Sequence, residues 1–511
     1  MQISSFDIFD TLITRKCKEP CDIFKVIEKE YPYPNFFNIR CLAEKNAYDK
    51  YLLSTNIDNI YEEFKKLTNE PDDIIILLRQ FEIKTELEYS IPIISNINKI
   101  RPNDIYISDM YLTPEIIYML LKKHNINIDN KLYVSSGGKS TGIIYEDLLK
   151  SYNIKLHTGD NMHSDIIMAN RYNIKTFHTK IHDFTKTELL LYDLKLFNFQ
   201  KLLRQFRLEN PYEEDTLYYK LYYEQITYNI PLLVLFSIQI KKILDSENRT
   251  KVLFFTRDCC LLIKIFNKLF PSIDAISFSS SRIIHYKKNI DYMNYVKKHY
   301  QCNNSIIIDL HGSFWSGREL YTTIFGILPR VHLLVYDNFK PGFNNLTYEI
   351  DNKKLSNMFG SEYIESMNYD LTGTLFSMIN DEELRFHNEH DETNINISHN
   401  AVLSFLEKNY DFSEIEQLDN ISELLVSIYK NISTDTCIKN IHIPPLNISK
   451  KIEKIMVSGH NIISNDSILQ NIPTKKNTMK MNIIDFNKNI NKTTKINKPI
   501  NMKINYTEPF P

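Results

Sequence analysis

The chain has little of what marks secreted, membrane-spanning or nucleic-acid-binding proteins. Its 511 residues carry a formal net charge of only −2, which argues against a broad basic face. The opening residues, MQISSFDIFD, show no basic start followed by an apolar stretch, so no secretory signal is visible. The longest apolar run, around 230–236, falls far short of the roughly 18 residues that a membrane span requires. Glycine is rare as well, at 11 residues, in a composition typical of an AT-rich genome.

Cysteine is scarce too. Seven cysteines, an odd number, are scattered through a large chain without a signal, and this favours reduced thiols. The close pairs Cys17/Cys21 and Cys259/Cys260 have no second pair at zinc-finger spacing, so they indicate packing rather than a metal site. These absences predict a cytoplasmic protein with no membrane contact and no nucleic-acid partner. They leave the question of a protein partner open.

What the chain does contain is enough apolar material for several buried cores. It is 43% hydrophobic and 12% aromatic, and its length predicts two to four domains. We place an α/β domain at 1–182, a helical connector at 183–245 and a second α/β domain at 246–440. The Asn- and Lys-rich remainder, 441–511, is predicted to be an extended, mobile tail.

Strands and helices alternate in the first third of the chain. Residues 2–9 indicate a buried strand that ends in an acid, and apolar spacing of three and four residues between about 21 and 90 predicts an inserted helical bundle. Further strands are predicted at 104–108, 131–135, 155–159 and 175–178, with helical stretches between them. This alternation is typical of a doubly wound parallel sheet, in which ligands bind at the carboxyl ends of the strands.

A second α/β pattern follows, with strands predicted at 251–258, 275–279, 305–312 and 331–337. Asp258 and Asp309 stand at strand ends with basic and hydroxyl side chains nearby. They either contribute to a second anion site or cap helices, with Arg257 paired to one of them. His311 is interpreted as a hydrogen-bonded scaffold residue.

Four short segments carry the chemistry, and all lie at predicted strand ends. They are SFDIFDTL (5–12), IYISD (105–109), KSTGIIYEDLL (139–149) and TGDNMHSD (158–165). Asp7 is suited to attack phosphorus, and the Ser108 hydroxyl and the Lys139 ammonium are suited to hold a phosphoryl group. Gly159 permits a tight turn that directs Asp160 and Asp165 towards a hard cation such as Mg²⁺.

These four segments resemble the motifs of the haloacid dehalogenase (HAD) superfamily, and the resemblance covers about the first third of the chain. IYISDMYLTPEII, KSTGIIYEDLL and TGDNMHSDIIMAN are close to the predicted hydrolases of this superfamily found beside bacterial polysaccharide genes. The resemblance implies that Asp7 is the nucleophile and that Lys139 is the lysine that pairs with it. It also implies that Ser108 is the phosphate-binding hydroxyl. It also implies that Asp160 and Asp165 bind Mg²⁺ and that a helical cap at about 15–90 closes over the pocket.

One position departs from the family. Typical phosphatases of the superfamily have an acid two residues after the nucleophile, and here that residue is Phe9. Its main-chain carbonyl still suits Mg²⁺, but it supplies no proton, a loss that typically costs ~10²–10⁴-fold in rate. The neighbouring Asp10 is expected to point to the opposite side of an extended segment.

The resemblance therefore implies an Mg²⁺-dependent phosphatase or phosphotransferase that acts on a phosphorylated small molecule of sugar or nucleotide type. The substrate has a good leaving group, or another group supplies the proton. Dehalogenation is disfavoured, because the acid pair Asp160/Asp165 would be superfluous there. The alternative is a HAD-fold binding or scaffold protein with little turnover.

Overall fold

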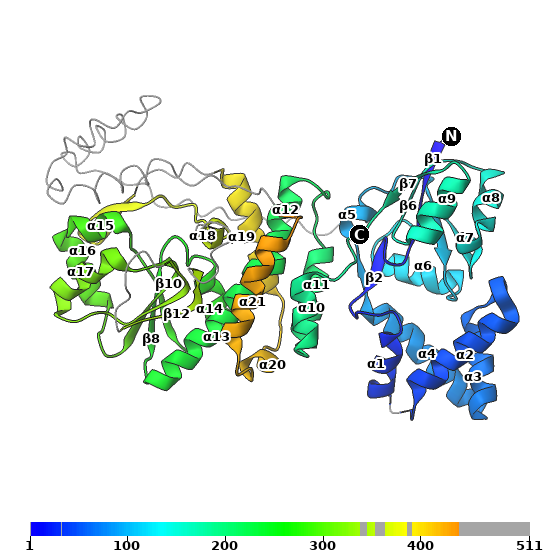
Figure 1. The fold of residues 1–511 in the computed structure, drawn as a ribbon, viewed down its shortest axis with the longest axis horizontal. Helices are drawn as coiled ribbons and strands as arrows, with labels where there is room; N and C mark the ends of the chain where they lie inside the picture. The colour runs from blue at the N-terminus through cyan, green and yellow to red at the C-terminus, as the bar shows by residue number, and fades with distance from the viewer. Residues whose placement is uncertain (1, 32, 338–344, 353–362, 386–390, 439–511) are drawn as a thin grey trace, which may run out of the picture. The chain divides into compact units, whose positions relative to one another are not determined.

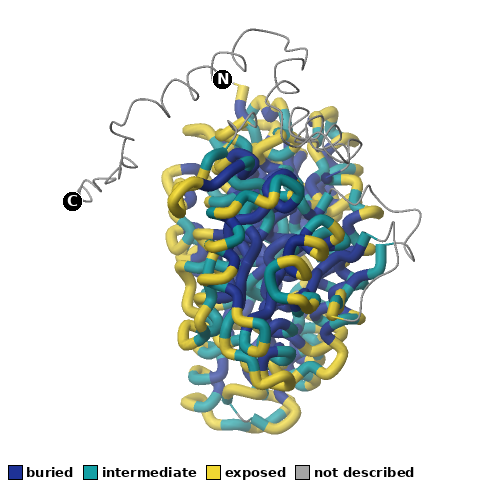
Figure 2. The backbone as a smooth tube through the Cα atoms, turned by 90° about the vertical axis from the view of Figure 1, so that its left-hand side faces the viewer, coloured by how far each residue is buried: buried dark blue, intermediate teal, exposed yellow. Residues whose placement is uncertain are grey.

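The computed structural model describes residues 2–31, 33–337, 345–352, 363–385 and 391–438 (Figure 1). Two five-stranded parallel sheets organise these residues, as the alternating pattern predicts. Buried backbone runs through the interior of the molecule and exposed turns lie on the outside (Figure 2). The α/β class is thus confirmed. The predicted domain boundaries stay predictions, and the predicted tail, 441–511, lies outside the described residues.

The first sheet has the order β5-β4-β1-β6-β7. Its strands are β1 (Gln2–Phe6), β4 (Ile105–Asp109), β5 (Lys131–Ser135), β6 (Asn153–Gly159) and β7 (Lys175–His178). From β1 the chain proceeds to β4 and β5 on one side and returns to β6 on the other side. The strand order therefore reverses between β1 and β6, and a crevice opens at the carboxyl ends of such a pair.

Helical segments connect these strands. They are α5 (Ile94–Ile97), α6 (Pro114–Lys123), α7 (Gly138–Thr141), α8 (Ile143–Leu149), the π-helical turn η2 (Met162–Ile167) and α9 (Met168–Arg171). The four strands predicted between residues 100 and 180 are all present within two residues of their expected bounds.

A four-helix insertion follows β1. It comprises α1 (Asp22–Glu30), α2 (Phe36–Tyr51), η1 (Leu52–Ser54), α3 (Ile57–Thr68) and α4 (Asp72–Tyr89). These helices confirm the predicted bundle and form a group of their own in Figure 1. Inside the bundle, the fully buried Arg40 makes two hydrogen bonds to Glu82, at 2.7 and 2.8 Å, and so satisfies a charge that would otherwise be costly to bury.

The base of the insertion is a two-stranded antiparallel ribbon that the sequence did not predict. It consists of β2 (Ile13–Arg15) and β3 (Ser90–Pro92). Three residues are too few to show an alternating pattern, so the pairing becomes visible only in the structure. The ribbon brings both ends of the insertion close to the carboxyl end of β1.

The connecting helices are α10 (Lys186–Asp193), α11 (Phe197–Leu208), α12 (Leu217–Glu224), η3 (Gln225–Asn229) and α13 (Ile230–Glu247). By length and composition, the stretch Leu217–Glu247 is apolar enough to cross a membrane, but 78% of its apolar window is buried inside the protein. Its role here is that of a core helix, since α13 packs against α14 and α21.

The second sheet has the order β12-β11-β10-β8-β9. Its strands are β8 (Lys251–Phe255), β9 (Asp274–Phe278), β10 (Ser305–Gly312), β11 (Val331–Tyr336) and β12 (Leu346–Asp351). The remaining helices are α14 (Leu262–Leu269), α15 (Arg282–Lys287), α16 (Ile290–His299), α17 (Trp315–Phe325), α18 (Tyr363–Ser366), α19 (Glu392–Glu407), α20 (Ser413–Glu416) and α21 (Ile421–Thr434). A hairpin of β13 (Leu375–Ile379) and β14 (Glu382–Arg385) forms a separate two-stranded sheet, and its Leu375 and Met378 pack in the core beside the second sheet. All seven cysteines are free thiols.

Candidate functional site

The carboxylate of Asp7 lies at the switch point of the first sheet. Asp7 is the first residue after β1, and its N–H donates to the Thr158 carbonyl on β6 at 2.9 Å. The Lys139 ammonium donates to Asp7 Oδ1 at 2.5 Å and to Asp165 Oδ1 at 2.7 Å. All three charged side chains are buried, at 7% exposure or less. Segments that are far apart in the chain therefore meet in a single ion-paired group.

Asp160 completes the group. One ligand oxygen each from Asp7, Asp160 and Asp165 lies within 4.8 Å of the others. The Thr11 hydroxyl stands between two of them, 3.2 Å from Asp7 Oδ2 and 3.3 Å from Asp160 Oδ1. The structure thus brings together four of the residues that the sequence predicts for the site: the nucleophile, its lysine partner and the two acids proposed for the metal.

The turn after β6 is shaped by the close approach of Asp165 to the backbone. A Cβ atom added to Gly159 would fall 2.4 Å from the Cβ of Asp165, which is closer than any real contact. Gly159 does not have a positive φ, so it is required for space rather than for backbone conformation. Asp165 stands in η2, and its Oδ2 accepts from the Asn161 N–H at 2.9 Å. This π-helical turn directs the carboxylate back towards Asp7.

The charges in the group do not balance. With three carboxylates against the Lys139 ammonium, two negative charges remain uncompensated when all are ionised. Burial raises the pKa of Asp7 well above its ordinary value, with repulsion from Asp165 and Asp160 adding to the effect against the pull of Lys139. Burial, with repulsion from Asp10 and Asp165, raises the pKa of Asp160 to about 7. A divalent cation would relieve this repulsion.

Lys139 and Asp165 favour each other's charged forms. Burial by itself would lower the pKa of Lys139, but the carboxylates of Asp7 and Asp165 raise it well above its ordinary value. Burial also opposes ionisation of Asp165, yet the Lys139 ammonium and His157 hold the pKa of that carboxyl well below its ordinary value. The Lys139 ammonium therefore favours the ionised form of the carboxylate that lies beside Asp7.

Two residues that support the group around Asp7 were not predicted from the sequence. The fully buried His157 lies in β6, with Nε2 3.3 Å from Asp165 Oδ1 and Nδ1 2.8 Å from the Ser5 hydroxyl. Asp109, at the end of β4, accepts from the Lys139 N–H at 3.0 Å and from the Ser140 N–H at 3.1 Å. It thereby holds the start of α7. The only sequence signal for Asp109 was its place beside Ser108 at a strand end.

The remaining two predicted residues lie at the same edge. Ser108 is 1% exposed in β4, which pairs directly with β1, so it stands at the carboxyl edge of the sheet. Phe9 follows Asp7 in the turn before β2, and the Arg15 guanidinium lies 4.9 Å from its ring centroid. The main-chain carbonyl of Phe9 as a metal ligand stays a prediction.

Two cavities border this turn. The larger, about 600 Å³, is lined by Phe9, Asp10 and Met110 together with side chains from α1 and α2. The smaller, about 480 Å³, is lined by Asp10, His182 and Arg204 among others. Asp10 lines both cavities, so it stands at the boundary between them.

The donor set fits Mg²⁺. This ion takes oxygen ligands, usually one or two carboxylates plus waters, and the group offers three carboxylates. Sulfur and nitrogen ligands, which would favour zinc, are absent from the three-acid group. The uncompensated negative charge points to a cation as well. The residues present are therefore suited to a hard divalent ion.

The acids of the second sheet are arranged differently. Asp258 follows β8, Asp309 lies in the neighbouring β10, and burial raises the pKa of Asp258 to about 7 with repulsion from Glu365. Burial and repulsion from Asp258 raise the pKa of Asp309 well above its ordinary value. The positive charges of Arg257, His311 and Arg282 oppose this effect on Asp258, so the second anion site and the structural role both stay predictions. His311 is hydrogen-bonded, as expected of a scaffold residue, because its Nδ1 lies 2.8 Å from Glu365 Oε1; its role stays a prediction.

Comparisons with known proteins give little guidance. No family model matches the chain, and no curated protein matches it either. Among solved structures, the chain is similar to YfnB from Bacillus subtilis, a candidate HAD-hydrolase crystallised with magnesium. The likeness covers 38% of this chain and 100% of that one, at 14% identity and a TM-score of 0.25. At these values the match carries no argument, and the function must be inferred from the geometry of the site.

Proposed function

We propose that the protein is an Mg²⁺-dependent phosphate-ester hydrolase that works through an aspartyl-phosphate at Asp7. The observation that carries the proposal is the buried group at the switch point of the first sheet, in which Asp7 contacts Lys139 and lies within 4.8 Å of two further acids. The resemblance of the first third of the chain to the HAD superfamily supports the same conclusion.

The reaction takes two steps. In the first, a carboxylate oxygen of Asp7 forms a bond to phosphorus while the bond between phosphorus and the leaving oxygen breaks, and the leaving group departs with the electron pair. In the second, water forms a bond to phosphorus, the bond to Asp7 breaks, and inorganic phosphate and the free carboxylate result. Each step needs a nucleophile held in line and a balance for the charge on the phosphoryl oxygens.

The chain's own residues supply the oriented nucleophile and compensate the charge on the phosphoryl oxygens. Lys139 holds one oxygen of Asp7 at 2.5 Å, which fixes the orientation of the nucleophile and places positive charge beside the transferring group. Ser108 stands at the same edge and is suited to donate to a phosphoryl oxygen. Asp7, Asp160, Asp165 and the carbonyl of Phe9 would hold Mg²⁺. When bound, the ion neutralises phosphoryl charge.

The substrate we propose is a phosphorylated small molecule of sugar or nucleotide type. The cavity of about 600 Å³ beside Phe9 and Asp10 is within the range of small-molecule sites. The helices α1 and α2, which line it, belong to the segment that we interpret as the cap. Because Phe9 offers no proton, we expect a good leaving group or a separate means of stabilising the departing oxygen.

One observation favours the alternative, a HAD-fold binding or scaffold protein. The ring of Phe9 lies against Arg15, whose guanidinium donates twice to Glu86 at 2.9 Å, so the position of the missing acid is firmly occupied. A protein that binds phosphorylated ligands without turnover would need the charged group but not an acid at position 9.

The experiment that separates the two is Mg²⁺-dependent release of phosphate from an aryl phosphate. We expect release by the native chain, none by Asp7→Asn, and native release by Asp129→Asn, which changes an exposed acid. Trapping of an acyl-phosphate with hydroxylamine in the native chain alone would identify Asp7 as the nucleophile. Equal release by native protein and Asp7→Asn, or no release by either, would contradict the proposal.

A further inference from the structure

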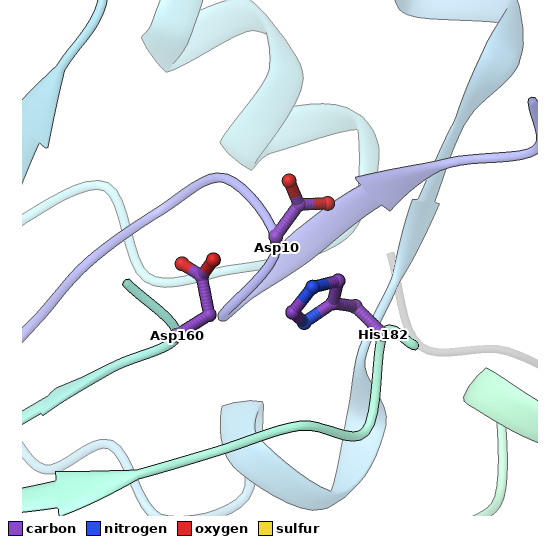
Figure 3. Close-up of side chains that lie close together, drawn as sticks. All are labelled: Asp10, Asp160 and His182. Carbon is purple, nitrogen blue, oxygen red and sulfur yellow. The ribbon is translucent and has the colours of Figure 1, made fainter. Parts of the chain in front are cut away.

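We propose that Asp10, Asp160 and His182 bind a second divalent cation, which shares the Asp160 carboxylate with the group around Asp7. Ligand atoms of these three residues lie within 4.8 Å of one another. They come from the turn after β1, the end of β6 and the segment after β7, and the side chains gather around one space (Figure 3). Two carboxylates and an imidazole at this spacing form a mixed oxygen and nitrogen donor set typical of first-row divalent metals.

The imidazole gives an observation that is independent of the acids. The Nδ1 atom of His182 is buried and makes no hydrogen bond within the part of the chain that the structure describes. A buried ring nitrogen without a partner is costly, and a metal ion is a partner that would satisfy it. The other ring nitrogen, Nε2, lies 3.4 Å from Asp183 Oδ1, and a carboxylate on that side commonly orients a metal-binding histidine. The main chain at this point is anchored, because Arg204 Nη1 donates to the His182 carbonyl at 2.6 Å.

Asp10 is also held in place by hydrogen bonds to its own turn. It has a φ of 60°, a left-handed conformation that an aspartate tolerates better than most residues. Its N–H donates to the Ile13 carbonyl at 2.6 Å, and the Thr14 hydroxyl donates to its Oδ1 at 2.5 Å. The turn therefore presents the carboxylate in a fixed orientation, which reduces the entropy lost on binding an ion.

The guanidinium of Arg204 lies near the proposed cation site but is engaged with other groups. Arg204 faces the same cavity, but its guanidinium donates to the carbonyls of Arg15 and His182 and to the Thr14 hydroxyl. It also lies 3.6 Å from Glu188. The hydrogen bonds of this cation are thus directed to the main chain and to other groups, and the space between the two carboxylates and the imidazole remains for a ligand.

Asp160 belongs to both groups of donors. A carboxylate shared by two ions is the usual bridge of two-metal sites, in which the ions stand about 3.5–4 Å apart and stabilise the attacking and the leaving oxygen. Asp10 also lines the 600 Å³ cavity beside Phe9. If the proposed hydrolysis is correct, Asp10, Asp160 and His182 would hold a cation that could balance negative charge on the leaving oxygen, a task that Phe9 cannot perform.

The test is the number of Mn²⁺ ions bound by the full chain after treatment with a chelator, measured by equilibrium dialysis and electron paramagnetic resonance. We expect two per chain and an exchange-coupled signal for the native protein. His182→Asn and, as a second variant, Asp10→Asn should each bind one and lose the coupling. His163→Asn, which removes an exposed imidazole near Asp160, should retain two.

The outcomes distinguish this inference from the proposed function. One Mn²⁺ in the native chain, or two in both His182→Asn and Asp10→Asn, would overturn the second site whatever the activity. Two coupled ions without phosphate release would support the second site and refute the hydrolase. With active protein, we expect His182→Asn to lose roughly 10-fold more activity on an alkyl phosphate than on an aryl phosphate, since the poorer leaving group depends more on the cation.

Discussion

Gly159 and Asp165 are in such close contact that any side chain at position 159 would displace the Asp165 carboxylate. A Cβ there would fall 2.4 Å from both Cβ and Cγ of Asp165. This contact lies between the end of β6 and η2, and Asp165 Oδ1 also lies 2.7 Å from the Lys139 ammonium.

Gly159→Ala should therefore weaken Mg²⁺ binding and activity together. Overpacking of this kind costs about 1–3 kcal/mol of stability. The matched control is Gly326→Ala, where a Cβ meets nothing within 4 Å but φ is 73°. That variant should lose about 1 kcal/mol through backbone strain and bind Mg²⁺ normally. Calorimetric titration with Mg²⁺ and thermal unfolding measure both effects, and normal Mg²⁺ affinity in Gly159→Ala would refute the argument.

Lys139→Gln should abolish phosphate release and destabilise the protein. The substitution leaves Asp7 and Asp165 buried without their cation, and breaking such a pair costs about 3–5 kcal/mol. Added Mg²⁺ should restore part of the lost thermal stability, because it neutralises the same carboxylates. Lys150→Gln, which breaks an exposed pair with Asp147, should change stability by less than about 1 kcal/mol. Equal thermal shifts in the two variants would contradict this account.

Phe9→Asp should raise turnover of an alkyl phosphate by about 100-fold or more, if the missing general acid limits the rate. Phe9→Asn is the control, since it matches the size of the new side chain but carries no acidic proton. Steady-state rates on alkyl and aryl phosphates separate the effects. A gain in both variants would mean that removal of the ring, rather than the acid, is responsible. No gain in either variant would contradict the prediction that the missing general acid limits the rate.

Glu224→Gln should remove a pH dependence of stability. Burial raises the pKa of Glu224 from 4.5 to about 7, so the folded state holds a proton that the unfolded state releases. Stability from this group is complete below pH 4.5 and is lost as pH rises through 7, by up to about 3 kcal/mol. The variant should unfold at a higher temperature than the native protein at pH 8, and the difference should shrink towards pH 5. A constant difference across this range would refute the assignment.

Much of the fold could be predicted because its signals are local. The first strand, predicted at 2–9 and observed at Gln2–Phe6, and the helices from 22 to 89 each carry their own periodicity, which depends only on neighbouring residues. The order of strands and helices then implied parallel sheets with ligands at the carboxyl edge. The ribbon of β2 and β3 could not be predicted, since three-residue strands have no detectable period.

The sequence by itself determined which side chains stand at the strand ends or in the turns and helices that follow them: Asp7, Ser108, Lys139, Asp160 and Asp165, with Phe9 in place of an acid. Only the tertiary structure decided how they meet, because contacts between residues far apart in the chain depend on strand order and helix packing. It placed Lys139 between two acids, His157 behind one of them, and His182 opposite Asp10. His182 lies beyond the last motif and has no local signal, so its approach to the carboxylates is a consequence of the path of the chain after β7.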